Sequence, residues 1–344
     1  MTKDSDPEQK YLRKLNRILG ERWRPLLTKE VLAQILTKKY IARKSKALEG
    51  LKMKPQMKLR KYGFQKDPLF NYQWNFQQIG LQAALESIQV NQTDQIVAVL
   101  DEGSAPLSSS NYADTAYVDG GYDFVGGDDD PSASVTLSSD PYSTQSHESH
   151  GIHVSGVVGA KNDGENINGM GVNVLPVRVL SEEQNNSEVY EALRFFAGET
   201  NASGKIYDNS DGKLAALNLS LGACVEDTDL EDDEVCRLIS KVRDQGVSVV
   251  VSAGNCDCAG GSGDLFCSVT NWPAACPGAI SVAAVDAAAE RAPYSSYHST
   301  VDIAAPGGDV TADLNSDGQV DGVLSYVDLD RLDHGLVRLW QHLT

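Results

Sequence analysis

Three short segments of this 344-residue chain end in or begin with side chains that acid–base chemistry could use. Asp101 follows the apolar run QIVAVL, His150 opens the segment HGIHVSG, and Asn255 ends the apolar run VVVSAGN. A carboxylate can orient an imidazole, an imidazole can accept a proton, and an amide N–H can stabilise a developing oxyanion. Each of the three also has an ordinary interpretation as a turn residue, a cap or a helix start. The chemistry therefore depends on whether the fold brings them together.

The segment around His150 has features of a site rather than of a plain surface helix. A second histidine, His153, follows at helical spacing, a pattern that also occurs in metal sites, but no acidic third ligand follows it at that spacing. Small residues line one side of the segment: Gly151, Ser155, Gly156 and Gly159. A helix with such a side can approach another backbone closely, which favours an active site.

The framework that must position these segments alternates apolar runs with helical stretches. Apolar runs predict strands at residues 95–100, 174–180, 214–219, 247–252, 279–284 and 301–304, and helices near residues 150, 187 and 232. This alternation predicts an α/β fold with a mainly parallel sheet flanked by helices on both faces. Functional groups gather at the carboxyl ends of strands in such a sheet, which is where Asp101 would lie.

Charge divides the chain into two parts. Residues 1–66 hold 19 Lys and Arg and 6 Asp and Glu, a net charge of +13, whereas the remainder has a net charge of −31. So negative a body would repel phosphates, which argues against nucleic-acid binding. No run is long and apolar enough to span a membrane. The basic part is predicted to be a helical leader that associates with the acidic body by Coulomb attraction.

All six cysteines fall between residues 224 and 276. An even number favours disulfides formed in an oxidising compartment, with the pairing left open. Zinc is the alternative for Cys256 and Cys258, but their spacing is shorter than the usual two-residue gap. We therefore expect a secreted or periplasmic protein with disulfides, although the first ten residues, MTKDSDPEQK, do not read as a secretory signal.

Taken together and in order, the motifs resemble the subtilisin-like serine proteases of the bacterial secreted type. QIVAVLDEG resembles the strand with the catalytic aspartate, HGIHVSG the histidine motif, LAALNLSLG the strand that lines the substrate site, and VVVSAGN the oxyanion segment. The stretch YSSYHSTVDIAAPGG resembles the approach to the catalytic serine. The likeness extends over roughly three quarters of the chain, from about residue 67 to residue 325.

The resemblance implies a role for each matching residue. Asp101 would orient His150, His150 would be the general base, and Asn255 would supply an oxyanion donor. The implied substrate-binding residues are Ser220, Leu221, Gly222, Ala253 and Gly254. The expected function is endoproteolysis of polypeptide substrates by a monomer without an organic cofactor, with residues 1–66 acting as a partial prosegment, an intramolecular chaperone or inhibitor.

Two positions depart from the family pattern. Glu102 stands where a Thr or Ser usually follows the aspartate, and Ile152 stands where Thr usually separates the Gly and His of the second motif. Both changes remove a hydroxyl next to the predicted site. If the Glu102 carboxylate points inward, it would raise the pKa of His150.

The nucleophilic serine of the family lies in a Gly-Thr-Ser-Met-Ala-x-Pro motif, which does not occur in these 344 residues. Codons allowed for residues 336–344 and for a following stop codon, regrouped by a one-base shift, can encode Gly-Thr-Ser-Met-Ala-Ala-Pro-His-Val. We therefore hypothesise a frameshift just after Tyr326. The catalytic domain, residues 67–326, would then be incomplete at its C-terminus, and residues 327–344 would be an out-of-frame tail. We expect such a chain to be inactive and to expose an apolar face of its sheet.

The segment DLNSDGQVD resembles the first nine positions of a calcium loop. The predicted ligands are Asp313, Asn315, Asp317 and Asp321. The twelfth position is Leu324 in place of the usual bidentate Glu, so a solvated acidic turn is the alternative.

Two other functions compete with proteolysis. A pseudoprotease would bind peptides or partners without cutting them, and the changes at residues 102 and 152 favour it slightly. A nucleotide-binding domain is the second rival, but no phosphate-cradling Gly motif follows the first strand.

Overall fold

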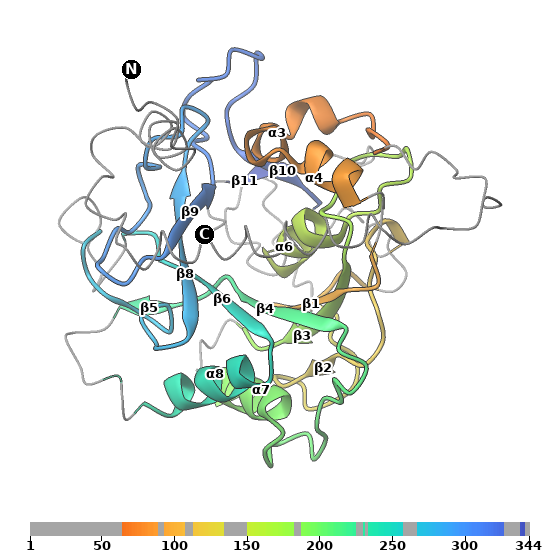
Figure 1. Ribbon diagram of the computed structural model, residues 1–344, viewed down its shortest axis with the longest axis vertical. Coiled ribbons are helices and arrows are strands. Elements are labelled where there is room, and N and C mark those ends of the chain that lie inside the picture. The colour runs from red at the N-terminus through yellow and green to blue at the C-terminus, as the bar shows by residue number, and fades with distance from the viewer. Residues whose placement is uncertain are drawn as a thin grey trace, which may run out of the picture. The chain divides into compact units, whose positions relative to one another are not determined.

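The computed structural model describes residues 64–88, 93–106, 113–133, 150–181, 187–224, 230, 233–256, 267–326 and 338–340. The predicted leader therefore lies almost entirely outside the described residues, as does most of the predicted out-of-frame tail. Figure 1 shows one central sheet with helices on either side of it.

The central sheet has seven strands in the order β2-β3-β1-β4-β6-β8-β9, and all neighbouring strands are parallel. Its strands are β1 (Ile96–Asp101), β2 (Tyr122–Asp123), β3 (Asn173–Arg178), β4 (Leu214–Leu219), β6 (Ser248–Ser252), β8 (Ala279–Val285) and β9 (Ile303–Pro306). All six predicted strands are present, and the α/β prediction is confirmed. β2 was not predicted because two residues carry no periodic signal.

Alternate residues of β1 show how the helices cover the two faces. Ala98 and Leu100 belong to the main core, to which the buried faces of α7 (Ser187–Ala197) and α8 (Glu234–Asp244) contribute. Val99, between them, packs with Val154 of α6 (His150–Gly159). Since successive strand residues point to opposite faces, α6 covers the face opposite to α7 and α8 (Figure 1).

Helix α8 begins where its sequence predicts. Asp233 is its N-cap, and the Asp233 side chain accepts a hydrogen bond from the Cys236 backbone N–H. Lys241 and Arg243 lie in its last turn, where they complement the helix dipole.

Several short elements were not predicted. They are η2 (Phe70–Tyr72), α3 (Trp74–Ile79), α4 (Leu81–Ile88), β5 (Ala223–Cys224), β7 (Asn271–Trp272), β10 (Val323–Ser325) and β11 (Arg338–Trp340). Gly80, with a φ of 72°, separates α3 from α4. β5 pairs with β7 and β10 with β11, both antiparallel.

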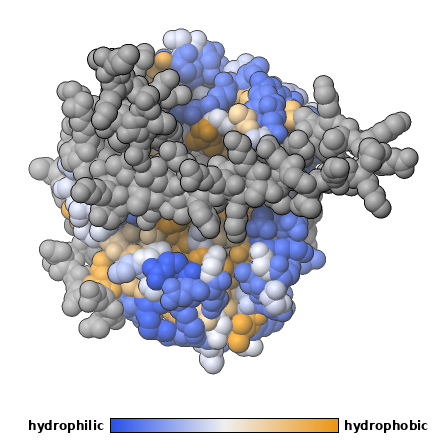
Figure 2. All heavy atoms as spheres, in the orientation of Figure 1, coloured by the Kyte–Doolittle hydropathy of each residue, from blue (hydrophilic) through white to orange (hydrophobic). Residues whose placement is uncertain are grey.

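The α6 side of the sheet is open at its β8–β9 edge. Val282 pairs with Ile303, and Ile280 points to the same face as both. Ile280 is 38% exposed and Ile303 is 58% exposed, unusual values for apolar strand residues. Figure 2 shows hydrophobic residues along the lower edge of the grey atoms, in the region where Figure 1 shows the sheet.

Helix α6 and strand β10 lie in close contact. The Ser325 hydroxyl donates to the His153 carbonyl at 2.7 Å, and the ring of buried His153 donates from Nε2 to the Val323 carbonyl at 3.1 Å. A Cβ built on Gly156 would lie 2.3 Å from Ser325 Oγ and 2.9 Å from Tyr326 Cδ2. His153 is therefore a structural residue, and Gly156 sets the spacing of the two elements.

We predict that Gly156→Ala destabilises the fold by about 1–3 kcal/mol, because the added methyl group overpacks this contact. The matched control is Ser155→Ala in the same helix. Ser155 is 1% exposed and its hydroxyl has no hydrogen-bond partner among the described residues, so its loss should be neutral or stabilising. Denaturant unfolding measures both, and equal stabilities of the two variants would contradict the prediction.

Candidate active site

Asp101 and His150 are in direct contact. Asp101 ends β1 and is fully buried, and its Oδ1 lies 2.8 Å from His150 Nδ1. The His150 side chain is 16% exposed, so the imidazole joins a buried acid to the solvent-accessible side. Because a carboxylate accepts, Nδ1 carries the proton, and the ring nitrogen that can take a further proton is Nε2. The second Asp101 oxygen, Oδ2, is buried without a hydrogen-bond partner in the described part of the chain.

A glycine allows this contact. A Cβ on Gly151 would lie 2.4 Å from the Gly103 carbonyl oxygen and 3.2 Å from Asp101 Cβ. Any larger residue would push the start of α6 away from the end of β1. The small residues that the sequence singled out here are thus needed for close approach.

Glu102 caps the helix that carries the histidine. Its carboxylate Oε2 accepts a hydrogen bond from the backbone N–H of His150, the first residue of α6, at 3.1 Å. Helix N-termini favour negative charge and have N–H groups without intrahelical partners. The departure at position 102 therefore adds a cap that fixes the start of α6 to the end of β1.

Ile152 does not face the site. It is 1% exposed and packs in a small core with Ala105, Ile167 and Leu324. Where the family pattern has a threonine hydroxyl, this chain has an apolar side chain that packs beneath the helix.

The predicted oxyanion and substrate-binding segments follow β4 and β6, the next strands in the sheet. Val99 of β1 is level with Asn218 of β4, and Leu219 of β4 is level with Val251 of β6. The residues just beyond these positions are Asp101, Ser220 and Ala253. Since the strands are parallel, all three lie at the same edge of the sheet.

The two predicted substrate-binding segments meet over Asn271 of β7, which the sequence analysis missed. A Cβ on Gly254 would lie 2.4 Å from Asn271 Nδ2, and a Cβ on Gly222 would lie 3.0 Å from the Trp272 carbonyl oxygen. Leu221 is tied to β6 through its carbonyl, which accepts from the Ser252 hydroxyl at 3.3 Å. No local pattern marks Asn271, because it comes close only when β5 and β7 pair.

A profile of the Subtilase family matches residues 92–329 of this chain. The chain belongs to the subtilase family. The resemblance drawn from the motifs is thereby confirmed.

Named relatives of this subtilase include an extracellular protease and thermitase. An extracellular protease from Xanthomonas campestris is 33% identical over 181 residues, which are 52% of this chain and 29% of that protein. Thermitase from Thermoactinomyces vulgaris is 31% identical over 215 residues, 61% of this chain and 62% of that protein. The chain thus spans less than two thirds of the length of either relative.

A solved structure of a protease from Pseudoalteromonas arctica has the same fold. It superposes with a TM-score of 0.58 at 26% identity and covers 76% of both chains. Among the described residues of this subtilase, the helices are too short or too polar for a membrane span.

The disulfide prediction is confirmed. Cys236 is bonded to Cys276, Cys256 is bonded to Cys267, and Cys224 is also in a disulfide. The zinc alternative is therefore wrong for Cys256, whose sulfur is engaged, and Cys258 lies outside the described residues.

The predicted calcium loop forms a series of tight turns. Side-chain oxygens of Asp313, Asn315 and Asp317 accept backbone N–H groups of residues 317–319. Asp321 is fully buried, and its Oδ1 has no partner among the described residues. Burial, with the charges of Asp313 and Asp317, raises the Asp321 pKa. A buried carboxylate with one oxygen lacking a partner among the described residues, near other acids, fits a hard cation. Leu324 packs in the core and supplies no ligand.

A second acidic cluster was not predicted. Asp67 is 3% exposed, its Oδ1 accepts from the Gly164 N–H at 2.6 Å, and its Oδ2 has no partner in the described chain. Burial, with the nearby charge of Asp163, raises the pKa of Asp67 to about 6. Burial and Asp163 also raise the Asp114 pKa. The three carboxylates come from distant parts of the sequence, so no motif marks them.

We predict that Glu102→Ala lowers the free energy of unfolding by about 0.5–2 kcal/mol, the usual effect of removing a helix cap. Glu102→Gln is the matched control because its amide oxygen can still accept the His150 N–H. Thermal unfolding of the two variants measures the effect. A glutamine variant as unstable as the alanine variant would show that the cap is not the cause.

Proposed function

We propose that this chain derives from a secreted serine endopeptidase in which Asp101 and His150 are two members of a catalytic triad. The observation that carries the proposal is the 2.8 Å contact between Asp101 Oδ1 and His150 Nδ1 at the carboxyl edge of the sheet. Membership of the subtilase family supports it, as do the relatives named as extracellular proteases.

Each residue has a defined task in the proposed reaction. Asp101 holds the Nδ1–H tautomer of His150, so Nε2 accepts the proton of a serine hydroxyl as the serine attacks a peptide carbonyl. His150 then returns the proton to the leaving amine, and water hydrolyses the acyl-enzyme. The Asn255 side-chain amide donates to the oxyanion of each tetrahedral intermediate. Backbone groups of Ser220, Leu221 and Gly222 on one side, with Ala253 and Gly254 on the other, hold the substrate.

The serine itself belongs to the shifted reading frame hypothesised for residues 327–344. The second candidate function is peptide binding without cleavage, which we propose because the Gly-Thr-Ser motif does not occur in these 344 residues. Residues 1–66, with their opposite charge, are proposed to act as the chaperone or inhibitor of the acidic body.

We predict that the gene, read one base out of register after Tyr326, encodes the Gly-Thr-Ser motif. A chain translated in that frame should react with a fluorophosphonate probe, because the probe traps an activated serine. The chain with the present sequence should not be labelled, and neither should the restored chain carrying His150→Ala. A gene sequence that cannot encode the motif refutes the frameshift. A restored, folded chain that resists labelling refutes the endopeptidase.

Calcium is the cofactor that we propose, at the Asp321 loop, at the Asp67 cluster, or at both. Asp67 and Asp321 each offer a buried oxygen without a partner among the described residues. A bound calcium ion would offset the repulsion among neighbouring carboxylates and so stabilise the fold.

We predict that calcium raises the Tm of the chain by a few degrees above its value in chelator. Each of the variants Asp67→Asn and Asp321→Asn should show a smaller rise in Tm with calcium, because it lacks one of the two proposed sites. In chelator, Asp67→Asn should have the opposite effect and raise the stability of the chain. The pKa of Asp67 is raised from 3.8 to about 6, so the natural chain loses stability as pH rises through that window. Asp67→Asn should therefore stabilise the calcium-free chain at pH 8 and do so much less at pH 4.

Glu165→Gln, an exposed acidic residue beside the Asp67 cluster, is the matched control and should keep the full calcium effect. A natural chain whose Tm is the same in calcium and in chelator would refute both sites.

A further inference from the structure

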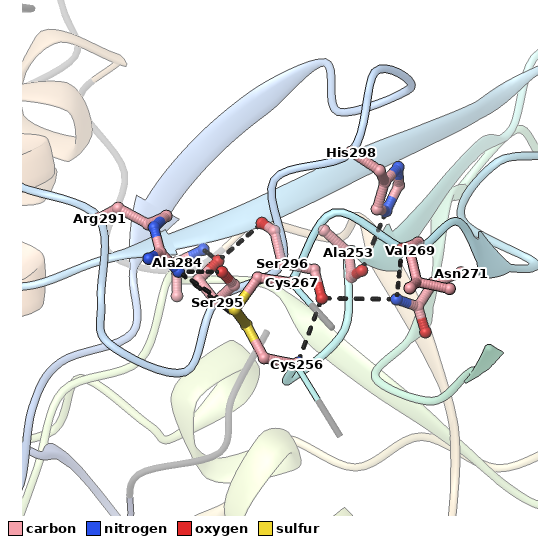
Figure 3. The surroundings of a disulfide bond; sticks show 10 residues. All are labelled: Ala253, Cys256, Cys267, Val269, Asn271, Ala284, Arg291, Ser295, Ser296 and His298. Carbon is pink, nitrogen blue, oxygen red and sulfur yellow. Dashed lines mark hydrogen bonds between the residues drawn. A yellow bond between two sulfur atoms is a disulfide. The ribbon is translucent and has the colours of Figure 1, made fainter. Parts of the chain in front are cut away.

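One segment, residues 295–298, holds the loop that presents Asn255, and its members Ser296 and His298 are buried. Figure 3 shows this segment beside the loop, with His298 reaching Ala253 and Ser296 reaching Cys256. The Ala253 carbonyl accepts from His298 Nε2 at 3.0 Å, and the Gly254 carbonyl accepts from the Ser296 N–H at 2.9 Å. The Cys256 N–H donates to Ser296 Oγ at 3.2 Å. The loop is thus held at residues 253, 254 and 256, on both sides of Asn255, by residues 40 to 45 positions away along the chain.

Ser296 has a special place among these contacts. Its N–H and its hydroxyl bind the residues immediately before and after Asn255, Gly254 and Cys256. Ser296 is fully buried, so water does not compete for either bond. Ser296 therefore binds the backbone on both sides of Asn255, once through its own N–H and once through its hydroxyl.

The loop needs such a restraint because its backbone is in an unfavourable conformation. Gly254 has a φ of 102° and Cys256 a φ of 59°. Glycine tolerates the left-handed region, but a cysteine there is uncommon and persists only when its surroundings enforce it. Cys256 receives that enforcement from the Ser296 hydroxyl and from its disulfide to Cys267.

Further contacts hold residues 295–298 in place. The Tyr297 N–H donates to the Cys267 carbonyl at 2.7 Å. Both cysteines of the Cys256–Cys267 disulfide are therefore hydrogen-bonded to residues 295–298. Arg291 donates to the Ser295 carbonyl at 2.7 Å and lies 5.0 Å from the centre of the Tyr297 ring. His298 receives a hydrogen bond at Nδ1 from the Thr300 hydroxyl at 2.6 Å. Burial lowers the pKa of His298, which agrees with a neutral ring that donates only from Nε2.

We propose that Ser296 is a positioning residue for the side-chain amide of Asn255. It fixes the two flanking peptide groups, so that the amide is directed at the oxyanion before the substrate arrives. The proposal rests on the proposed function, in which Asn255 is the oxyanion donor. Preorganised donors stabilise an oxyanion far better than donors that must first be ordered.

The first test observes Asn255 directly in the full chain, labelled with ¹⁵N on asparagine. The side-chain amide signal of Asn255 is identified by its disappearance in Asn255→Ala. We expect this signal to be single in the natural chain and shifted or broadened in Ser296→Ala. Ser295→Ala is the matched control: Ser295 is equally buried, but its hydroxyl accepts the Ala284 N–H at 2.7 Å and donates to the Ser296 carbonyl at 3.2 Å, so it binds neither Gly254 nor Cys256. An Asn255 signal that is unchanged in Ser296→Ala, or changed equally in both variants, would overturn the proposal.

The second test measures the consequence for an oxyanion. Two peptides of one sequence are compared, one ending in a carboxylate and the other in a primary amide. A charge-assisted hydrogen bond from Asn255 should make the natural chain prefer the carboxylate by about tenfold. Ser296→Ala should lower this preference to about twofold while affinity for the amide peptide stays within about twofold, because only the donor is misplaced. Ser295→Ala should keep the tenfold preference.

The outcomes separate the two hypotheses. A preference that survives in Asn255→Ala, or is missing from the natural chain, counts against Asn255 as the donor and so against the proposed function. A preference that is lost in Asn255→Ala but intact in Ser296→Ala overturns only the positioning role.

If Ser296→Ala fails to fold, Ser296→Thr and Ser296→Val replace it as a pair of equal shape that differs in the hydroxyl. Threonine should keep the carboxylate preference and valine should lose it. Equal preferences in this pair would also overturn the proposal.

Discussion

The parallel arrangement of β1, β4 and β6 is the constraint on which the candidate site depends. Parallel strands end at one edge of a sheet, and here the register places Asp101, Ser220 and Ala253 just beyond level positions of neighbouring strands. The segments that follow lie far apart in the sequence and carry different chemistry. Their proximity follows from strand order, which the hydrogen bonds of the sheet enforce.

Close packing of α6 brings the two proposed catalytic residues, Asp101 and His150, into contact. Gly151 lets the helix approach the end of β1, Glu102 binds the first N–H of the helix, and Asp101 binds the ring of His150. All three contacts join β1 or its following turn to α6. The glutamate that departs from the family pattern strengthens this junction, because a carboxylate is a favourable partner for a helix N-terminus.

The acidic character of the body has local consequences. Asp67 and Asp321 are buried carboxylates whose pKa values are raised, chiefly by burial and also by neighbouring acids. Each destabilises the fold when it is ionised without a cation. Dependence of stability on calcium would therefore be a property of this charge distribution. The open face near Ile280 and Ile303 is a separate weakness, because apolar surface in water promotes association.

The sequence by itself determined the elements whose signals are local. Apolar runs gave the six main strands, since a buried parallel strand needs continuous hydrophobic residues. Ordered motifs gave the family and pointed to Asp101 and His150, because each of them follows or opens a recognisable segment. The loop with Asp313 could be noted for the same reason, since its spacing is local.

Tertiary structure alone decided the contacts that join distant segments. Asn271 under Gly254, Asp67 beside Gly164, and Ser296 around Asn255 each bring together residues from separate parts of the chain. The direction of the Glu102 side chain was also undetermined, because a carboxylate after a strand can turn toward a ring or toward a helix end. Such contacts depend on strand order and loop pairing, and these are set by packing of the whole sheet rather than by any pattern along the sequence.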